Sequence, residues 1–578
     1  MKPNTTTVPP AAQRAVSQTI WFGIVYLVAV CSLLLTQPAV AQSLAQTPAS
    51  VVDGSAKLIQ HYDPTQVLRV TLSLRPPHQT EEDQFLKDLY TKGSPQFHHF
   101  LSPAEWNQRF SPSVADEQAV LEWARSQGLT VTQRYPNRLL INFEAPAGVL
   151  EKAFQVTLNQ YKAQSNTFFS SDREPQVPAG LQRIVTSVEG LNNLPRMRSA
   201  NGMLKHYPGP DYAPGPVVRA GESRHANGDR KQLKRAIASK SKAGTSPFIT
   251  NGIYDLPDLY SSNGYDYQAL YNQGHCCNPL GNPGGSPKET SIAIIGFGDV
   301  AYSDLDGFTS MYPFLAYNID KFYFNGTPNC NQDCGEVTLD AEYAIATANS
   351  FGSYLDTAHV YMYEGADQYD GTYTTIYNQM LTDNYARVLS ESFVCTEEVT
   401  QSQNNCDPAV MDARHAIFDA MVGQGWTLVV ASGDWGAYND CQYLSVSYPA
   451  SDPDFVGVGG TVLTLSPAFV SEVGWQGGTA PTSCTGTATV GPDGGSGGGC
   501  SIHFAAPSYQ SSPAFSTVAA AFPTSHSMRG IPKDGISKVR PAALTAPVLP
   551  LPRSPVFMLR KTPTCSTSAN RTAASSEW

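Results

Sequence analysis

Two acidic residues at helical spacing could do acid–base chemistry. Glu336 and Asp340 lie four positions apart within residues 335–340, at the start of an expected helix, so their carboxylates share one helix face. Two acids at that spacing repel each other, and the pKa of one should rise. Taken alone the spacing is typical of a solvated surface pair, so its interpretation depends on what lies nearby.

A second candidate is Asp434, in the segment Ser-Gly-Asp-Trp-Gly. It follows an apolar strand expected at residues 427–431, and strand carboxyl ends are where parallel-sheet proteins bind ligands. The flanking glycines permit close backbone approach and unusual φ values. An aspartate that merely stabilises a tight turn is the alternative.

The third candidate is a glycine-rich segment, residues 494–500. Its backbone, around Gly497 and Gly498, could offer a hydrogen-bonding edge to an extended peptide. A flexible loop is the alternative. The segment is not a phosphate loop, because it lacks Gly-Lys-Ser/Thr and a following helix.

Histidine would be the rival general base. His415 lies in a helix expected at residues 410–422, and His503 follows the glycine-rich segment. No motif places either beside a nucleophile, so a Ser-His-Asp arrangement is disfavoured and both are expected at the surface or the edge of the core.

The elements expected around these candidates alternate between apolar strands and helices. The strands are expected at residues 292–295, 360–363, 387–390 and 427–431, and the helices at 339–350, 376–381 and 410–422. Continuous apolar strands that alternate with helices predict an α/β domain whose parallel sheet is covered on both faces.

An earlier unit, residues 62–193, mixes strands and helices and predicts a compact α+β domain. Its expected strands are 67–74, 129–131, 139–143 and 184–188, and its expected helices are 80–92, 114–127 and 146–154. Residues 67–74 alternate between apolar and polar side chains, as a half-buried strand does.

Residues 195–250 separate the two units. Their prolines interrupt helices, and a basic run follows at residues 230–242. An exposed linker that is easily cut is the favoured interpretation, and a site for anionic surfaces is the alternative.

The N-terminus predicts export. Lys2 and Arg14 precede an apolar run at residues 20–35, and Ala-Val-Ala ends at Ala41, which fits a signal peptide cleaved after that residue. A membrane anchor is the alternative, but the run is shorter than the ~20 residues of a span. We therefore expect a secreted protein without a stable membrane anchor.

Charge and cysteine content agree with an exported protein that does not bind nucleic acid. The 578 residues carry a formal net charge of −11, whereas nucleic-acid binding needs a basic face. Nine of the 11 cysteines lie between residues 270 and 500, which in an exported chain indicates disulfides. Cys330–Cys334 and Cys395–Cys406 are plausible local pairs. Zinc is the alternative, but two close Cys-x-x-Cys pairs are absent.

In order and spacing, the candidate segments resemble the sedolisin (serine-carboxyl peptidase) family over about residues 62–530. Residues 335–340 resemble its Glu-x-x-x-Asp helix, and residues 431–436 its Ser-Gly-Asp-x-Gly turn. Further matching segments are residues 448–451, 458–461, 494–500 and 504–510. Residues 62–193 resemble its activation prodomain, of the prokumamolisin type.

The resemblance implies a role for each matched acid. Glu336 would be the general base that takes the proton of a serine hydroxyl, and Asp340 would orient it. Asp434 would donate a hydrogen bond in the oxyanion hole and must then be protonated. Because a carboxylate base titrates at about pH 4.3, against about 6.5 for histidine, we expect activity at acidic pH.

The resemblance also implies an architecture. A signal peptide (1–41) precedes an α+β, ferredoxin-like activation prodomain (55–194), and a linker with a processing site (195–250) leads to an incomplete subtilisin-like catalytic domain (251–532). An aberrant tail (533–578) follows. We expect a monomeric serine-type endopeptidase zymogen, with its own prodomain as intramolecular inhibitor and proteins or peptides as substrates.

The resemblance fails after Pro532. The family nucleophile lies in a Gly-Thr-Ser after the glycine-rich segment, but the only Gly-Thr-Ser here ends at Ser246, in the linker, with flanks that do not match. The calcium that the family implies has no assignable ligands, and Gly296 stands where some members carry an acid. A frameshift or truncation near Pro532 is our hypothesis, and a natural variant with a diverged tail is the alternative.

A general base without a nucleophile forms no acyl-enzyme. The alternative function is therefore a non-catalytic secreted protein that binds peptides in the same cleft.

Overall fold

The computed structural model describes the two expected folded units and part of the segment between them. The described residues are 43–163, 166–199, 218–226, 291–312, 315, 317–328, 334–349, 358–397, 405–434, 436, 445–465, 469–475 and 495–507. The expected signal peptide, most of the linker and the aberrant tail lie outside these ranges. No helix in the described ranges is both long enough and apolar enough to cross a membrane.

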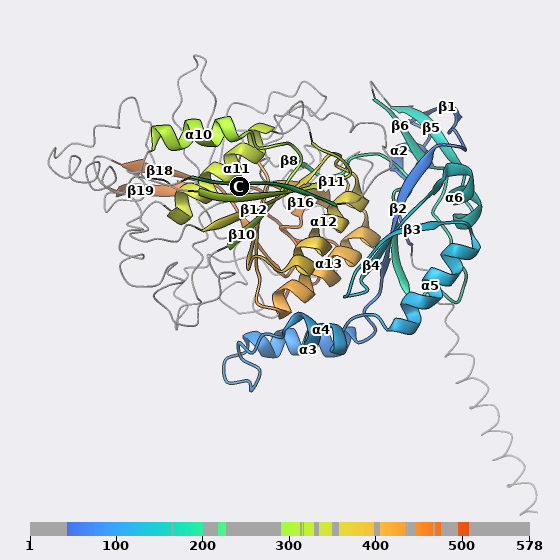
Figure 1. Cartoon of the computed structure of the whole chain (residues 1–578), viewed down its shortest axis with the longest axis horizontal. Helices are drawn as coiled ribbons and strands as arrows, with labels where there is room; N and C mark the ends of the chain where they lie inside the picture. The colour runs from blue at the N-terminus through green and yellow to red at the C-terminus, as the bar shows by residue number, and fades with distance from the viewer. Residues whose placement is uncertain are drawn as a thin grey trace, which may run out of the picture. The chain divides into compact units, whose positions relative to one another are not determined.

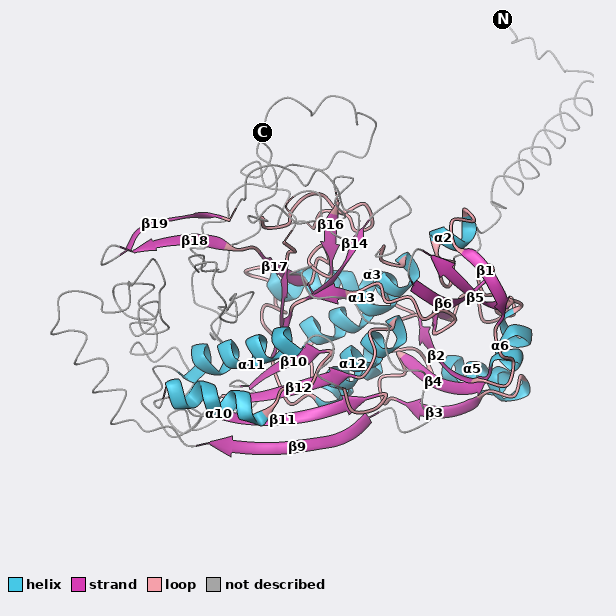
Figure 2. Cartoon of the chain, turned by 90° about the horizontal axis from the view of Figure 1, so that it is seen from above, coloured by secondary structure: helices cyan, strands magenta, loops and turns pink. Residues whose placement is uncertain are grey.

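A seven-stranded sheet forms the centre of the described C-terminal part, in the order β17-β15-β13-β10-β12-β11-β9. Its strands are β9 (Val218–Ala226), β10 (Ser291–Gly296), β11 (Tyr317–Phe324), β12 (His359–Gly365), β13 (Val388–Glu391), β15 (Thr427–Ala431) and β17 (Phe455–Val458). Every neighbouring pair is parallel except β9 with β11. Figure 2 shows β9, β11, β12 and β10 side by side. The predicted α/β class with a parallel sheet is confirmed.

Helices cover both faces of this sheet, and the side chains of β10 alternate between them. Ile292 and Ile294 pack in the core shared with α10 (Tyr302–Met311) and α11 (Cys334–Asn349). Ala293 and Ile295 pack in the core shared with α12 (Asp370–Asp383) and α13 (Pro408–Gly423). Burial on both faces explains why the strand is a continuous apolar run.

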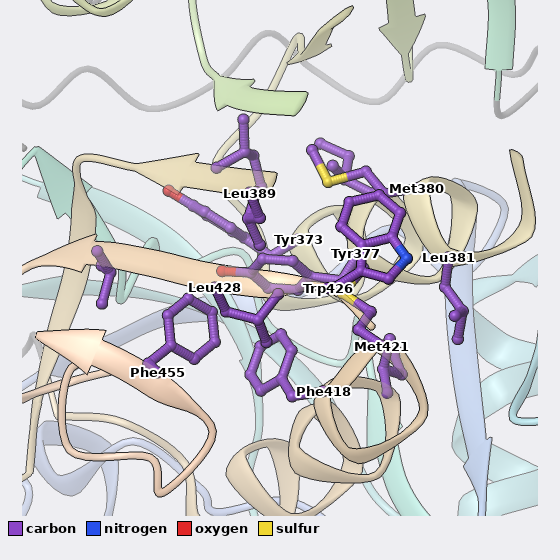
Figure 3. Close-up of a cluster of buried hydrophobic side chains, with 14 of the residues drawn as sticks. Tyr373, Tyr377, Met380, Leu381, Leu389, Phe418, Met421, Trp426, Leu428 and Phe455 are labelled. Atoms are coloured by element: carbon purple, nitrogen blue, oxygen red, sulfur yellow. The ribbon is translucent and has the colours of Figure 1, made fainter. Parts of the chain in front are cut away.

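Aromatic and sulfur-containing side chains fill the second core. Figure 3 shows Tyr373, Tyr377 and Met380 of α12 and Phe418 and Met421 of α13 gathered with Leu389 of β13 and Leu428 of β15. The N-terminus of α13 is capped. The side chain of Asp407 accepts a hydrogen bond from the backbone N–H of Ala409, and Pro408 occupies the first helical position.

The N-terminal part has its own antiparallel sheet, in the order β3-β4-β2-β7. Its strands are β2 (Val67–Leu74), β3 (Thr130–Arg134), β4 (Leu140–Pro146) and β7 (Val185–Glu189), and its helices are α3 (Gln79–Tyr90), α4 (Pro103–Arg109), α5 (Val114–Ser126) and α6 (Ala147–Phe154). The small sheet β1-β5-β6 consists of β1 (Lys57–His61), β5 (Leu158–Ala163) and β6 (Asn166–Ser171).

Short elements complete the described chain. They are α2 (Ala49–Val52), β8 (Arg198–Ser199), β14 (Phe393–Glu397), β16 (Val446–Tyr448), β18 (Thr461–Leu465) and β19 (Phe469–Gly474). Sequence analysis missed α4, although its capping box is readable: the Ser102 side chain accepts from the Glu105 N–H and the Glu105 carboxylate accepts from the Ser102 N–H.

The strand expected at residues 67–74 is confirmed as β2, but its second half is buried on both faces rather than half-buried. The polar residues Thr71 and Ser73 are as buried as their apolar neighbours, because α12 packs on β2. Thr71 donates to the amide of Asn142 at 2.8 Å, and that amide contacts the Thr375 hydroxyl on α12 at 3.3 Å. The polar positions therefore take part in hydrogen bonds that join β2 and β4 to α12. Figure 1 labels these three elements.

An apolar contact continues this interface. The Trp106 side chain, from α4, packs so closely on Gly423 that a Cβ at that glycine would lie 1.9 Å from the ring. Beside it, the Leu101 N–H donates to the Gly423 carbonyl at 3.0 Å. Only glycine leaves room for this arrangement at the end of α13.

Two further expectations, the extent of the linker and the local disulfide pairs, are confirmed only in part. Residues 218–226, assigned to the linker, form β9 and extend the large sheet. The disulfide Cys395–Cys406 is present, which confirms one of the two expected local pairs. Cys330 lies outside the described residues, so the other pair stays a prediction.

Candidate active site

The candidate residues lie where the parallel strands end. Asp434 follows the carboxyl end of β15, and Ser392 follows that of its neighbour β13. The first turns of α11, which carry Glu336 and Asp340, pack over the end of β10. A Cβ at Gly296, the last residue of β10, would lie 2.5 Å from a Val337 methyl carbon. Sheet topology thus brings all these segments to one edge.

The acidic pair on α11 is buried. Glu336 is 2% exposed and Asp340 is 1% exposed, so the pair is not the solvated surface pair that its spacing alone would suggest. Charged groups stay buried only when partners compensate for the lost water. This burial separates the pair from an ordinary i,i+4 surface pair.

Asp340 has one partner that sequence analysis missed. The Ser392 hydroxyl donates to Asp340 Oδ1 at 2.9 Å, while Oδ2 is buried and accepts no hydrogen bond from the described residues. Burial raises the pKa of Asp340 well above its usual value, and the charges of Glu336 and Glu391 raise it further, whereas the bond from Ser392 lowers it. This carboxyl is therefore suited to hold a proton.

Two more buried carboxyls at this edge were also missed. Glu391, the last residue of β13, accepts from the Tyr377 hydroxyl at 2.7 Å, and burial raises its pKa to about 8. Glu364, at the end of β12, pairs in register with Gly296, and burial raises its pKa to about 8 against the opposing charge of Lys321. Sequence analysis noted that Gly296 of β10 stands where some family members carry an acid. The structure has an acid, Glu364, directly beside Gly296 on the neighbouring strand β12.

Asp434 sits in a turn that is built against the glycine-rich segment. The Gly495 N–H donates to the Asp434 carbonyl at 2.8 Å, and the Gly436 N–H donates to the Gly495 carbonyl at 2.9 Å. The φ of Gly433 is +95°, a conformation that side chains rarely adopt. The Asp434 side chain is half-buried. Glycine before the acid is thus a requirement of the turn.

The glycine-rich segment uses part of its backbone within the protein. The Gly497 N–H donates to the Gly433 carbonyl at 2.9 Å, so this donor is not available to a ligand, and an edge for an extended peptide would have to begin at Gly498. Ser496 fixes the segment on its other side, because its hydroxyl accepts from the Gly460 N–H at 2.6 Å. The segment is a tethered loop in residues 495–500.

Glu397 anchors the chain that follows. Its carboxylate accepts from the Ser501 hydroxyl at 2.8 Å and from the Ile502 N–H at 2.8 Å. Glu397 is 4% exposed and ends β14, a strand that sequence analysis did not predict. The sequence offers one clue to β14, namely that it begins shortly after the strand expected at residues 387–390.

The two histidines considered as rival bases are engaged with carboxylates. His415 Nδ1 lies 3.0 Å from Asp452, and His503 Nε2 lies 2.8 Å from Asp412. Both rings are about four-fifths buried. These partners give no support to a Ser-His-Asp arrangement.

Metal ligands are scarce in the described ranges. One group of three His, Cys, Asp or Glu side chains lies close enough to share an ion there: His415, Asp452 and Asp454. Calcium takes oxygen ligands, so a group with an imidazole does not fit the calcium that the family implies. The calcium segment that the family implies is expected nearer the C-terminus, where this sequence no longer resembles the family.

Comparison with known proteins gives consistent matches. A family model described as the pro-kumamolisin activation domain matches residues 55–194. Xanthomonalisin of Xanthomonas sp. (strain T-22) is 28% identical over 522 residues, covering 82% of this chain and 55% of that protein. Sedolisin of Pseudomonas sp. (strain 101) is 27% identical over 481 residues, covering 80% and 70%.

A solved structure of Pseudomonas sedolisin, a serine-carboxyl proteinase complexed with two molecules of pseudo-iodotyrostatin, is 27% identical. That match covers 39% of this chain and 62% of the other, with a TM-score of 0.32. The chain spans about half the length of xanthomonalisin (55%).

The homologues are serine-type peptidases, which are hydrolases, and residues 55–194 match an activation domain. Within that class, the matches over most of the chain support a precursor similar to those of the sedolisin family.

Proposed function

We propose that the chain is the precursor of a secreted serine-carboxyl endopeptidase that acts in acid. The observation that carries this proposal is the burial of Glu336 and Asp340, 2% and 1% exposed, on one face of a single helix. Two buried acids within one turn are costly unless they share protons. Such a pair fits a site of proton transfer better than a pair of exposed acids with no catalytic role.

The proposed mechanism assigns one task to each acid. Glu336 takes the proton of a serine hydroxyl as the oxygen attacks the peptide carbonyl, and Asp340 orients Glu336. Asp434, kept neutral, donates a hydrogen bond to the oxyanion. The proton then passes from Glu336 to the leaving amine, and water hydrolyses the acyl-enzyme. The nucleophilic serine of this chain is not assigned.

The prodomain is proposed to act as an intramolecular inhibitor and folding partner. Support comes from Arg196, which lies two residues after the prodomain, is 5% exposed and donates to the Gln46 carbonyl at 2.9 Å and the Asn405 carbonyl at 3.1 Å. The same guanidinium lies 3.2 Å from Asp370, which also binds Arg414. Breaking such a buried charged contact is costly, so the docked prodomain should persist until the chain is cut.

The finer architecture is also part of the proposal. The order β-α-β-β-α-β, with the strands arranged β3-β4-β2-β7, supports a ferredoxin-like prodomain. A parallel sheet with helices on both faces supports a subtilisin-like catalytic domain. We further propose secretion after cleavage at Ala41 and a monomeric state.

The alternative is a non-catalytic, secreted peptide-binding protein. The observation in its favour is that no Gly-Thr-Ser follows the glycine-rich segment in the sequence. Such a protein would keep the cleft and pair peptides along the edge that begins at Gly498.

Acid incubation separates the two proposals. Purified full-length protein is held at about pH 4 and followed by gel electrophoresis and N-terminal sequencing, beside Glu336→Gln and the control Glu81→Gln, an exposed acid of α3. The peptidase proposal predicts release of the prodomain by wild type and control but not by Glu336→Gln. A stable full-length band in all three would favour the peptide-binding protein, and cleavage that persists in Glu336→Gln would refute the assigned base.

A further inference from the structure

Residues 44–47 precede the matched activation domain and are nevertheless largely buried. The family model begins at residue 55, so it gives this segment no role. Leu44, Ala45 and Thr47 are 4%, 8% and 6% exposed. A segment before a domain is usually poorly ordered unless other parts of the protein hold it. The burial of this one therefore has a specific cause in its contacts.

The prodomain holds the start of the segment. The Leu44 side chain packs in the prodomain core, which also contains Val188 of β7. The Val188 N–H donates to the Leu44 carbonyl at 2.8 Å. Shortly after the segment, Val51 of α2 packs against a smaller core that contains Leu194, near the end of the prodomain. Apolar burial and a backbone hydrogen bond thus fix the segment to the prodomain.

The catalytic domain holds the segment through the backbone of Gln46. The Gln46 N–H donates to Asp407 Oδ2 at 2.6 Å, and the Arg196 guanidinium donates to the Gln46 carbonyl at 2.9 Å. Asp407 is 4% exposed, and its other oxygen accepts from the Ala409 N–H at the start of α13. These bonds recognise the main chain at Gln46, whereas the side chain that is buried is that of Leu44.

Arg196 brings the chain that leaves the prodomain to the same place. Its guanidinium lies 3.2 Å from Asp370 Oδ2 and 3.7 Å from Asp407 Oδ2, and it donates to the Asn405 carbonyl at 3.1 Å. A planar guanidinium with several donors suits such a set of acids and carbonyls. Both ends of the prodomain, residues 44–47 before it and Arg196 after it, are therefore fixed where α12 and α13 begin.

A purely internal role in the prodomain fold does not explain these contacts. In that case the backbone of Gln46 would be bound within residues 55–194, but its N–H and its carbonyl are bound by Asp407 and Arg196, both outside that range. Loss of Arg196 would leave the buried Asp407 carboxylate without a cation beside it, which is costly. The contacts thus link the two domains.

We propose that residues 44–47 and Arg196 form a latch that keeps the prodomain bound to the catalytic domain after the linker is cut. A cut anywhere beyond residue 199 leaves both parts of the latch on the prodomain fragment, and their partners Asp370 and Asp407 on the other fragment. Release of the prodomain then requires the latch to open. This inference rests on the proposed prodomain docking, but it does not require that the chain be an active peptidase.

Retention of the fragment after cutting tests the latch. Full-length protein is cut briefly with a lysine-specific protease, whose sites include lysines within residues 230–242, and N-terminal sequencing locates the cut. The proposal predicts that both fragments of wild type co-elute in gel filtration, and that Arg196→Met raises the dissociation rate at least about tenfold. Arg173→Met is the matched control, because Arg173 also pairs with an aspartate but its side chain is 66% exposed.

The N-terminal part of the latch has its own variants. Leu44→Asp should raise the dissociation rate, because it places a charge in the prodomain core. Gln46→Ala should leave the rate unchanged, since the latch binds the main chain there, and so should Leu58→Asp, at a leucine that is 61% exposed. Equal rates for wild type, Arg196→Met and Leu44→Asp would overturn the latch, as would fragments of wild type that separate at once.

Hydrogen exchange on the unaltered full-length protein covers the case in which a variant fails to fold. The amides of Gln46 and Val188 should exchange far more slowly than unprotected amides, as should that of Ala409, which donates to the same carboxylate as Gln46. Fast exchange at Gln46 beside slow exchange at Ala409 would overturn the latch. Acid incubation tests the peptidase itself, so the failure of one proposal can be told from the failure of the other.

Discussion

At the scale of single residues, the chemistry depends on how few partners Asp340 has. One carboxylate oxygen receives the Ser392 hydroxyl and the other receives no bond from the described residues, beside two further acids, Glu336 and Glu391. A buried acid in that setting holds its proton at a pH where an exposed acid has lost it. Among the described residues, Ser392 is thus the group that favours the ionised form.

Removal of that hydroxyl should be measurable as stability. Ser392→Ala leaves Asp340 without its donor, and we expect a loss of about 1–3 kcal/mol in the free energy of unfolding. Chemical denaturation near pH 6 measures it. Ser303→Ala, which removes an exposed hydroxyl 3.4 Å from Asp304, is the control and should stay within about 0.5 kcal/mol of wild type. Equal values for both variants would show that the Ser392 bond contributes nothing.

At the scale of elements, the sequence predicts strands better when both faces are apolar. The limits of β15 agree with the expectation for residues 427–431, because a continuous apolar run between helices has few other interpretations. β9 was missed because residues 218–226 carry no apolar alternation, and its partner β11 supplies the pairing. Edge strands of this kind depend on a distant partner that local patterns do not reveal.

The candidate site, like the strands, could be predicted from the sequence only in part. The spacing of Glu336 and Asp340 is visible in the sequence, but their burial is not, since it depends on how α11 packs over Gly296. Ser392 and Glu364 were missed because their relevance comes only from strand register. Residues at strand ends become neighbours through the sheet, and no local motif records this.

The contact of Trp106 with Gly423 gives an element-scale prediction. Gly423→Ala places a methyl group 1.9 Å from the present ring position, so Trp106 must move, and overpacking of this kind costs about 1–3 kcal/mol. The thermal midpoint and Trp fluorescence should both change. Gly307→Ala, within α10 and with nothing within 4 Å of the added carbon, should instead be neutral or stabilise its helix by up to about 1 kcal/mol. A neutral Gly423→Ala would mean that α4 does not pack there.

At the scale of the whole molecule, buried carboxyls join the two parts. Glu189, from β7 of the prodomain, accepts from the Thr374 hydroxyl of α12 at 2.6 Å. Burial raises the pKa of Glu189 from 4.5 to about 7, and Arg414 acts against that shift. Because the folded chain binds this proton more tightly than the unfolded chain, its contribution is greatest below about pH 4.5 and is lost as the pH rises to about 7.

The sign of this linkage can be checked with one substitution. Wild type should lose stability between pH 5 and pH 8 in part through Glu189, and Glu189→Gln should lose less over the same interval. Thermal midpoints across that range, with Glu174→Gln at an exposed position as the control, measure the difference. A wild type whose stability changes no more than that of Glu189→Gln would contradict the raised pKa.

The central claim is that Glu336 and Asp340 form a buried pair that handles protons, and the pKa of Asp340 tests it most directly. Carbon-13 NMR of labelled aspartate side chains, with Asp340→Asn to assign the signal, follows the titration in wild type and in Glu336→Gln. The account predicts a pKa for Asp340 well above the usual value of about 3.9, and a lower one once the charge of Glu336 is removed. An ordinary pKa in wild type, or no change in Glu336→Gln, would contradict it.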